Sequence, residues 1–375
     1  MEKKRAAMME TAELRKKRAQ EKVGVHIPGD IISEILLRLP ARILGKFRCV
    51  SKSWLSITTN TVFVRANAQH NLITRPSLII GDRQPYLASA NAASVFPIRL
   101  QPMETMSENY FVMASCDGLV CARSLQDSQH FISNPLTGQS IALPLDNIYL
   151  TCKLGFYFHR STSKYRLIRF KVPMTHESEV LVVGERSWRS IPVSIPAFFD
   201  CECPLELSGK LYWLAHTRRK IICKLPPDII VIFDEEEEVY SAICPPPTKK
   251  LQKYLGGNLV NFNGELGLWV VGLNVTIDLW IMDTFWIKRY SVNYACIHKC
   301  PSPFKIKARS RPWILGGAIS IRDEELLVHL STIIAPHSLA RWNLKSGACV
   351  LQHLVYKSST FRSTFPYTET LTNPQ

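Results

Sequence analysis

The sequence predicts an α+β multidomain chain, in which an N-terminal three-helix module precedes an all-β, propeller-like domain of five to six four-stranded blades. Two observations predict this fold. Apolar residues recur at helical spacing between residues 27 and 64, and β-type hairpins recur about every fifty residues beyond residue 70. We therefore expect a basic tail over 1–24, the helical module over 25–66 and the β domain over 67–375.

The first expected helix lies between two prolines. Its apolar residues fall at positions i, i+3, i+4 and i+7 and would form one stripe, namely Ile32, Ile35, Leu36 and Leu39. Pro28 suits the first helical turn, and Pro40 ends the helix because proline has no amide hydrogen.

A second helix is expected from Ala41 to about Val50, and a third after Ser51. The second should turn three side chains inward, namely Leu44, Phe47 and Val50. The Ser51 hydroxyl is a suitable N-cap for the third helix, which would carry Trp54 and Leu55. Three such short helices bury little apolar surface, so we expect the module to complete its core against a partner. An ordinary helical subdomain packed on the rest of the chain stays open as the alternative.

Beyond residue 70, runs rich in Val, Ile, Phe, Tyr and Trp predict strands. A unit of strand, turn, strand and often proline recurs over residues 130–144, 179–192, 228–247, 277–292 and 338–354. Its turn markers stand 50, 50, 49 and 60 residues apart, and they are Asn134, Gly184, Asp234, Asp283 and Asn343. This regularity favours radial repetition over a two-sheet sandwich, which remains the competing fold.

Each unit is preceded by a second hairpin with its own turn. These turns are Asp117-Gly118, 160–164, Ser208-Gly209, Asn263-Gly264 and Asp323-Glu324. Two hairpins per period give four strands, which is typical of a propeller blade. Five blades are visible, and residues 70–112 could supply a sixth. The pairs Gly256-Gly257 and Gly316-Gly317 would let a strand backbone approach its neighbour closely.

The net charge of +15 raises the question of nucleic acid. Residues 1–26 hold eight Lys and Arg against four Glu, but the remaining excess is diffuse, whereas a nucleic-acid binder usually concentrates its basic residues on one face. A basic RNA-binding or scaffolding propeller remains the alternative function. The runs KKR (3–5) and RKKR (15–18) are either a nuclear import signal or a solvated tail, so we expect the nucleus, the cytoplasm or both.

No apolar stretch is long enough to span a membrane, and the first residues lack the apolar region of a secretion signal. We therefore expect no membrane association. The eleven cysteines should be free thiols in a reducing compartment.

The sequence contains no P-loop, G-x-S-x-G or H-E-x-x-H motif, so we expect neither a catalytic residue nor a cofactor. A propeller enzyme of the kelch oxidase type would need converging His, Tyr and Cys ligands, and no such set is visible. Cys296, His298 and Cys300 alternate along the chain and could reach one metal, with Cys201 or Cys203 as a fourth ligand. Cysteine is also a common small buried residue, and we expect no metal.

Two further features receive structural interpretations. The acidic run 234–238 falls at a hairpin turn, where charges are expected to stay solvated. Seven tryptophans recur with the strands and are expected between blades, namely Trp188, Trp213, Trp269, Trp280, Trp286, Trp313 and Trp342.

The helical stretch resembles an F-box. The matching residues are Ile27-Pro28 in place of the usual Leu-Pro, Asp30, Glu34-Ile35-Leu36, Arg38-Leu39-Pro40, Phe47-Arg48-Cys49-Val50, Ser51-Lys52-Ser53-Trp54 and Phe63. Gly45 departs from the family, which commonly has Ala or a larger apolar residue there. Glycine inside a helix costs about 0.5–1 kcal/mol relative to alanine.

The β domain resembles the F-box-associated domain of plant F-box proteins, through SCDGLV (115–120), NPLTGQ (134–139), LP (143–144) and GKLYW (209–213). The resemblance implies a substrate-recruiting subunit of an SCF-type cullin–RING ubiquitin ligase. The helical module would bind a Skp-type adaptor, the β domain would hold a target protein, and the chain would contribute no catalytic residue. The residues implied at the adaptor surface or in the core beneath it are Ile27, Pro28, Leu36, Leu39, Pro40, Leu44, Val50 and Trp54.

Overall fold

The computed structural model describes residues 27–75, 77–80, 85–89, 95–97, 100, 110–126, 128–144, 154–170, 177–195, 198–199, 204–216, 229–246, 254–272, 276–293, 314–320, 324–331, 338–353 and 364–374. The basic tail and its two charged runs lie outside these residues. The chain divides into two compact units, Met1–Leu39 and Pro40–Gln375. The predicted domain limits at residues 24 and 66 stay predictions.

The helices precede all the strands. The first unit contains α2 (Gly29–Leu37), and the second begins with α3 (Ala41–Phe47), α4 (Lys52–Thr59) and α5 (Thr61–Thr74). The first three confirm the predicted helices, with the second ending three residues earlier than expected. The fourth, α5, was not predicted. Among the described residues, no helix has the length and apolarity that a membrane crossing requires.

The described strands form six antiparallel sheets, which we number as blades in chain order. Blade 1 contains β25 (Thr364–Tyr367), β1 (Ser77–Ile80), β2 (Tyr86–Ser89) and β3 (Val95–Pro97). Blade 2 contains β4 (Tyr110–Cys116), β5 (Leu119–Ser124), β6 (His130–Ser133) and β7 (Ser140–Ala142). Blade 3 contains β8 (Leu154–His159), β9 (Lys164–Phe170), β10 (Glu177–Val182) and β11 (Arg189–Pro192).

The second half of the chain continues the pattern. Blade 4 contains β12 (Phe198–Phe199) and β13 (Leu205–Leu207), which both pair with β14 (Lys210–His216), followed by β15 (Ile229–Asp234) and β16 (Tyr240–Ile243). Blade 5 contains β17 (Tyr254–Phe262), β18 (Glu265–Gly272), β19 (Thr276–Met282) and β20 (Trp286–Asn293). Blade 6 contains β21 (Ile314–Ser320), β22 (Glu325–Ser331), β23 (Ser338–Asn343) and β24 (Cys349–His353).

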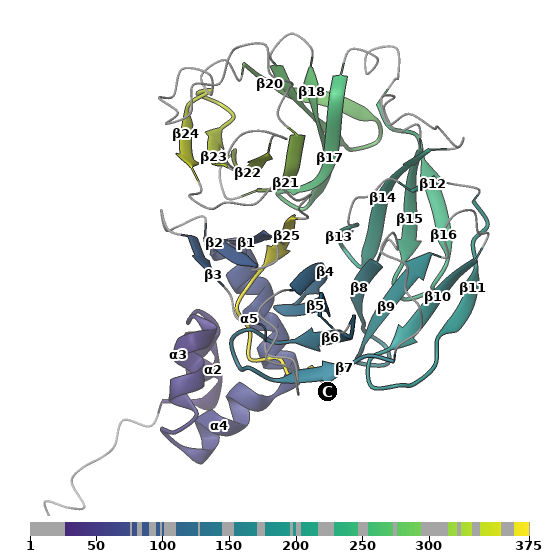
Figure 1. Cartoon of the computed structure of the whole chain (residues 1–375). Helices are drawn as coiled ribbons and strands as arrows, with labels where there is room; N and C mark the ends of the chain where they lie inside the picture. Colours follow the sequence, from purple (N-terminus) through teal and green to yellow (C-terminus); the bar gives the residue numbers. More distant parts are fainter. Residues whose placement is uncertain are drawn as a thin grey trace, which may run out of the picture. The chain divides into compact units, whose positions relative to one another are not determined.

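The ring closes through blade 1, which takes strands from both ends of the β region. The last strand, β25, pairs with β1 so that Ser77 lies opposite Tyr367 and Ile80 opposite Thr364. Around the axis, β4 contacts β8 and β25, while β21 contacts β17 and β25. Figure 1 shows the six sheets placed radially, with the yellow β25 beside the dark blue β1. The predicted propeller is confirmed, and its blade count is six.

The predicted hairpin turns have the backbone geometry that their residues favour. At Asp117-Gly118 both residues have positive φ, which is the type I′ arrangement of two-residue hairpins. The predicted close approach is present at Gly257, and the other three glycines of the two pairs stay predictions. A Cβ on Gly257 would lie 2.6 Å from the Trp269 carbonyl oxygen, which forbids a larger residue there.

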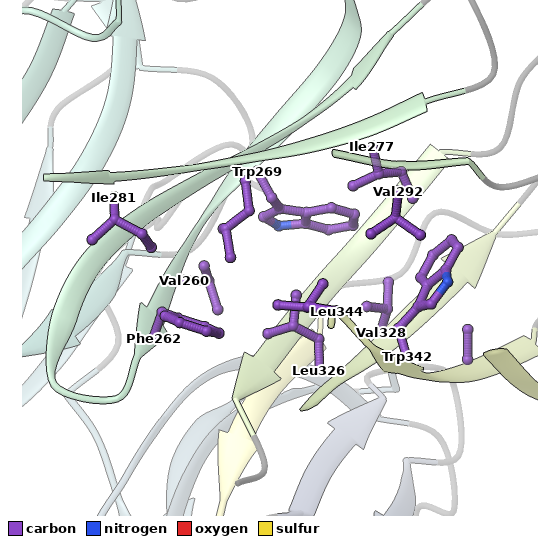
Figure 2. Close-up of a cluster of buried hydrophobic side chains, with 12 residues drawn as sticks. Val260, Phe262, Trp269, Ile277, Ile281, Val292, Leu326, Val328, Trp342 and Leu344 are labelled. Atoms are coloured by element: carbon purple, nitrogen blue, oxygen red, sulfur yellow. The ribbon is translucent and has the colours of Figure 1, made fainter. Parts of the chain in front are cut away.

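The hydrophobic core lies between consecutive blades. Figure 2 shows the cluster between blades 5 and 6, in which Trp269 and Trp342 are buried with aliphatic residues such as Val260 and Leu326. Equivalent clusters join blades 1 and 2, 2 and 3, 3 and 4, and 4 and 5. The tryptophans buried in these layers, as predicted, are Trp213, Trp269, Trp280 and Trp342. Trp188 and Trp286 pack at their margins, and Trp313 lies outside the described residues.

Candidate functional site

Helix α2 carries apolar side chains that face water. Ile31 and Ile35 are each 51% exposed and stand one helical turn apart on the same face, and Ile27 precedes them at 44% exposure. We call these three residues the α2 row. Leu36 is fully buried on another face of the helix. The expected single stripe is therefore divided between a buried part and an exposed part.

Helix α3 is short, and this explains why one prediction about it was wrong. Leu44 is buried as predicted, but Val50 is 59% exposed instead of turning inward. The helix ends at Phe47, so Val50 lies in the following turn, where helical spacing no longer sets its direction. It lies immediately before the Ser51 cap of α4.

The start of α4 is fixed by the predicted cap. Ser51 Oγ accepts a hydrogen bond from the backbone N–H of Trp54 at 3.1 Å. The Trp54 ring meets Phe47 edge to face, with 5.2 Å between centroids, and so joins α4 to α3. Arg48 donates to the carbonyl oxygen of Thr58 at 2.9 Å, which places a cation at the C-terminal end of α4. Leu55 stays 43% exposed.

The unpredicted helix α5 begins directly after α4. Asn60 Oδ1 accepts from the backbone N–H groups of Val62 and Phe63, at 2.9 and 3.1 Å. Val62 is 77% exposed. Farther along, buried Asn71 donates to buried Asn67 at 3.0 Å, so polar residues occupy part of the inner face. This mixture leaves no apolar stripe, which is why periodicity did not reveal the helix. The Asn60 cap is the signal that could have found it.

The helices hold a disproportionate share of exposed apolar side chains. Among the described residues eleven large hydrophobic side chains are exposed, and six of them fall within residues 27–62, namely Ile27, Ile31, Ile35, Val50, Leu55 and Val62. The other five are spread over the propeller. An apolar row on a helix that no described residue covers is suited to dock against another protein.

The eight residues implied by the resemblance occupy different environments. Ile27, Pro28 and Val50 are exposed; Leu39, Pro40 and Trp54 are partly buried; Leu36 and Leu44 are buried. The exposed ones are available for contact, and the buried ones support the fold. Their contact with an adaptor stays a prediction. The exposed Ile31, Leu55 and Val62 were not among the predicted site residues.

The acidic turn of blade 4 corrects the expectation of solvated charges. Glu238 pairs with Arg166 and Arg189 of blade 3, and Tyr157 donates to it at 3.2 Å. Burial raises the pKa of Glu238. The two guanidinium groups lower the pKa by more than burial raises it, so it lies below its ordinary value. Glu236 accepts the N–H groups of residues 160 and 161. The turn therefore connects two blades.

Glu235 in the same turn is 5% exposed, and its Oε1 has no hydrogen-bond partner among the described residues. Burial, and next the carboxylate of Glu206, raise the pKa of Glu235 to about 8. Asp117 acts in the same direction, while Arg160 and Arg65 oppose the increase. The carboxyl group is therefore largely protonated at neutral pH.

No metal centre is formed by the described residues, which contain no group of three candidate ligands. Cys296, His298 and Cys300 lie outside the described residues, as do Cys201 and Cys203. The hypothesis that they bind a metal therefore stays untested.

Comparison with known proteins agrees with both parts of this architecture. A model of the F-box domain matches residues 26–65, and a model of the F-box associated beta propeller domain matches residues 84–305. The propeller in this structure extends beyond the matched range, because blade 6 and β25 follow residue 305.

Proteins similar to this chain occur in Arabidopsis thaliana. The F-box protein At5g65850 is 28% identical over 72% of this chain and 70% of its own length. The F-box protein At3g07870 is 26% identical over 71% of this chain and 72% of its own, and the F-box protein At3g57590 is 27% identical over 68% of each. With an F-box ahead of six blades, the chain belongs to the F-box proteins that carry an F-box-associated β-propeller domain, a family with plant members.

Proposed function

We propose that this chain is the substrate-recruiting subunit of an SCF-type cullin–RING ubiquitin ligase. The F-box would bind a Skp-type adaptor, and the propeller would hold the target protein. The family membership supports a role in substrate recognition. The observation that carries the adaptor contact is the α2 row, which presents Ile31 and Ile35 to solvent within the F-box match.

The chain's contribution to the reaction is proximity. Holding a target and an adaptor-bound ligase on one chain converts ubiquitin transfer into an effectively intramolecular step, which raises the local concentration of the acceptor lysine. Bond making then belongs to the ubiquitin-conjugating enzyme. No bond-making side chain is required from the propeller or from the helices.

The test replaces the exposed face of α2 while preserving the helix. Ile31→Gln combined with Ile35→Gln removes apolar contact area, and glutamine is a better helix former than isoleucine. If each side chain contributes about 1.4 kcal/mol to docking, capture of a Skp-type adaptor should weaken on the order of 100-fold. Binding is measured by titration of labelled adaptor.

The matched control changes a polar pair of the same helix. Glu34 and Arg38 form an exposed i, i+4 ion pair at 3.2 Å, so Glu34→Gln with Arg38→Gln should alter helix stability by only about 0.3–0.5 kcal/mol. Adaptor affinity should stay close to that of the wild type. Undiminished capture by the Ile31 and Ile35 variant would contradict the proposed adaptor surface.

A further inference from the structure

The segment Thr368–Pro374, which we call the tail, alternates between buried residues and residues that are partly or fully exposed. It follows β25, and its side chains at Thr368, Thr370 and Thr372 are all buried. The tail contacts α3, because Glu369 Oε1 accepts from Arg42 Nε at 2.6 Å. Leu371 also lies within ordinary contact distance of a Cβ built on Gly45. Glu369 and Leu371 of the tail therefore lie against an F-box helix.

The other side of the tail rests on blade 2. A Cβ on Gly118 would lie 2.3 Å from Thr370 Cγ2 and 2.4 Å from the Thr368 carbonyl oxygen. Gly118 also has a φ of +76°. Both the tail and the turn thus require glycine at this place in the SCDGLV motif.

Asn134 of the NPLTGQ motif binds the tail directly. It is fully buried, and its Nδ2 donates to the carbonyl oxygens of Thr370 and Thr372 at 3.0 and 2.7 Å. Its Oδ1 serves a different purpose, since it accepts the N–H groups of Leu136 and Thr137 and so shapes the turn.

Two other blades contain the same turn. In blade 4 Asp234 Oδ1 accepts the N–H groups of Glu236 and Glu237, and in blade 6 Asn343 Oδ1 accepts the N–H of Ser346. In all three turns the first residue also accepts a backbone bond from the fifth, at 2.9 Å. An aspartate therefore satisfies this turn. Among the described residues, the amide nitrogen of Asn134 donates to the tail and not to the turn.

Beside the tail, blade 2 also holds α5. Arg65 Nε donates to Asp117 Oδ2 at 2.8 Å, and Tyr165 donates its hydroxyl to the same oxygen at 3.1 Å. The Arg65 guanidinium stacks on the Phe158 ring at 3.5 Å from its centroid. The Arg65 and Asp117 side chains are only 22% and 15% exposed, so this pair is far less screened than a surface ion pair.

We propose that Asp117, Gly118 and Asn134 form a seat that holds helices α3–α5 at one orientation on the propeller, and that this orientation sets where a bound target meets the ligase. Arg65 from α5 and the tail from the C-terminus occupy the seat. The positioning role rests on the proposed function above. The SCDGLV and NPLTGQ motifs of blade 2 are then explained by their contacts with α5 and with the tail.

Asn134→Asp tests the seat, because it keeps the turn acceptor and removes both donors to the tail. Losing two hydrogen bonds should speed hydrogen–deuterium exchange in the C-terminal peptide on the order of tenfold. Asn343→Asp makes the same change in blade 6, where the hydrogen bonds of the described residues keep Asn343 Oδ1 within its own turn, and it should leave exchange unchanged. Thermal unfolding of the full chain checks that both variants keep a folded propeller.

A second variant addresses the other half of the seat. Asp117→Asn keeps the size of the side chain and suits its positive φ of 46°, but it removes the negative charge that faces Arg65. Exchange should then rise in the peptide that contains α5 more than in the tail. The tail and α5 responses together distinguish a two-part seat from a general loosening.

The positioning role is measured by self-ubiquitination of the full chain reconstituted with adaptor, cullin–RING ligase and charged conjugating enzyme. The wild type should be modified at a narrow set of propeller lysines, Asn134→Asp at a wider set, and Asn343→Asp as the wild type. Unchanged tail exchange and an unchanged lysine pattern in Asn134→Asp would overturn the seat. A wild-type chain that cannot capture the adaptor would overturn the proposed function and the positioning role together.

Discussion

The helical stretch 27–62 and the propeller treat their large apolar side chains in opposite ways. Ile31, Ile35 and Val62 are at least half exposed, whereas Trp213, Trp269 and Trp342 are at most 2% exposed. Among the described residues, buried clusters join consecutive blades from 1 to 6, and β25, which contacts β21 of blade 6, completes blade 1. The described residues of the propeller thus bury their large apolar side chains between blades, while those of the helical stretch leave several exposed.

Among the variants that test this comparison, Trp269→Ala should cause the largest loss in the free energy of unfolding. Trp269 is completely buried and lies between blades 5 and 6 (Figure 2). Deleting a buried aromatic side chain removes its transfer free energy and leaves a cavity, so we expect the free energy of unfolding to fall by about 3–5 kcal/mol. Chemical denaturation followed by tryptophan fluorescence and circular dichroism measures the loss.

Val62→Ala provides the contrast from the helices. Because Val62 is 77% exposed, its truncation should change stability by less than about 0.5 kcal/mol. A comparable loss in the two variants would break the distinction between a self-sufficient propeller and helices that await a partner.

Glu235→Gln tests the buried carboxyl of blade 4. Its pKa is about 8 in the folded chain, against about 4.3 for an exposed glutamate. The folded state binds the proton more tightly, so this contribution to stability is complete below pH 4 and is lost as the pH rises through 8. Glutamine imitates the protonated form. We expect equal stabilities near pH 4 and a gain of about 2–4 kcal/mol for the variant at pH 9.

The exposed Glu237, two residues farther along the same turn, provides a matched control variant. Glu237→Gln removes a solvent-exposed carboxylate from the same turn, so it should change the free energy of unfolding by less than about 0.5 kcal/mol. Urea denaturation at pH 4, 7 and 9 compares the three proteins. A Glu235→Gln curve parallel to the wild-type curve would contradict the raised pKa.

Local patterns account for what the sequence predicted well. The Ser51 cap, the Pro40 stop and the Asp117-Gly118 turn each depend on residues within a few positions of one another. The ring closure was not predicted, because β25 is a lone four-residue strand without a hairpin partner next to it in sequence. The prediction of solvated charges at the acidic turn was wrong because the partners of Glu238 are also distant in sequence, 72 and 49 residues away.

The candidate docking surface was only partly predictable. Apolar residues stand side by side at Ile31-Ile32 and at Ile35-Leu36, so helical spacing permits two adjacent stripes and does not say which one is buried. The structure buries Leu36 and exposes Ile35. The resemblance to an F-box located the docking module at residues 27–64. Which side chains of the module are exposed could be determined only from the three-dimensional structure.

A small gain in stability is expected from helix α3. Gly45 lies inside α3, and a Cβ at this position would meet only Leu371 Cδ2, at an ordinary contact distance of 3.6 Å. Gly45→Ala should therefore stabilise the helix by about 0.5–1 kcal/mol without disturbing the tail.

Hydrogen exchange of the α3 amides measures this gain. Lys46→Ala is the control, because Lys46 is exposed next to Gly45 and lysine and alanine are both good helix formers. Because the substitution adds a methyl group next to the tail and leaves the α2 row untouched, adaptor affinity should not fall. Reduced affinity in Gly45→Ala would show that docking requires α3 to deform, and the helices would then be an adaptable surface instead of a preformed one.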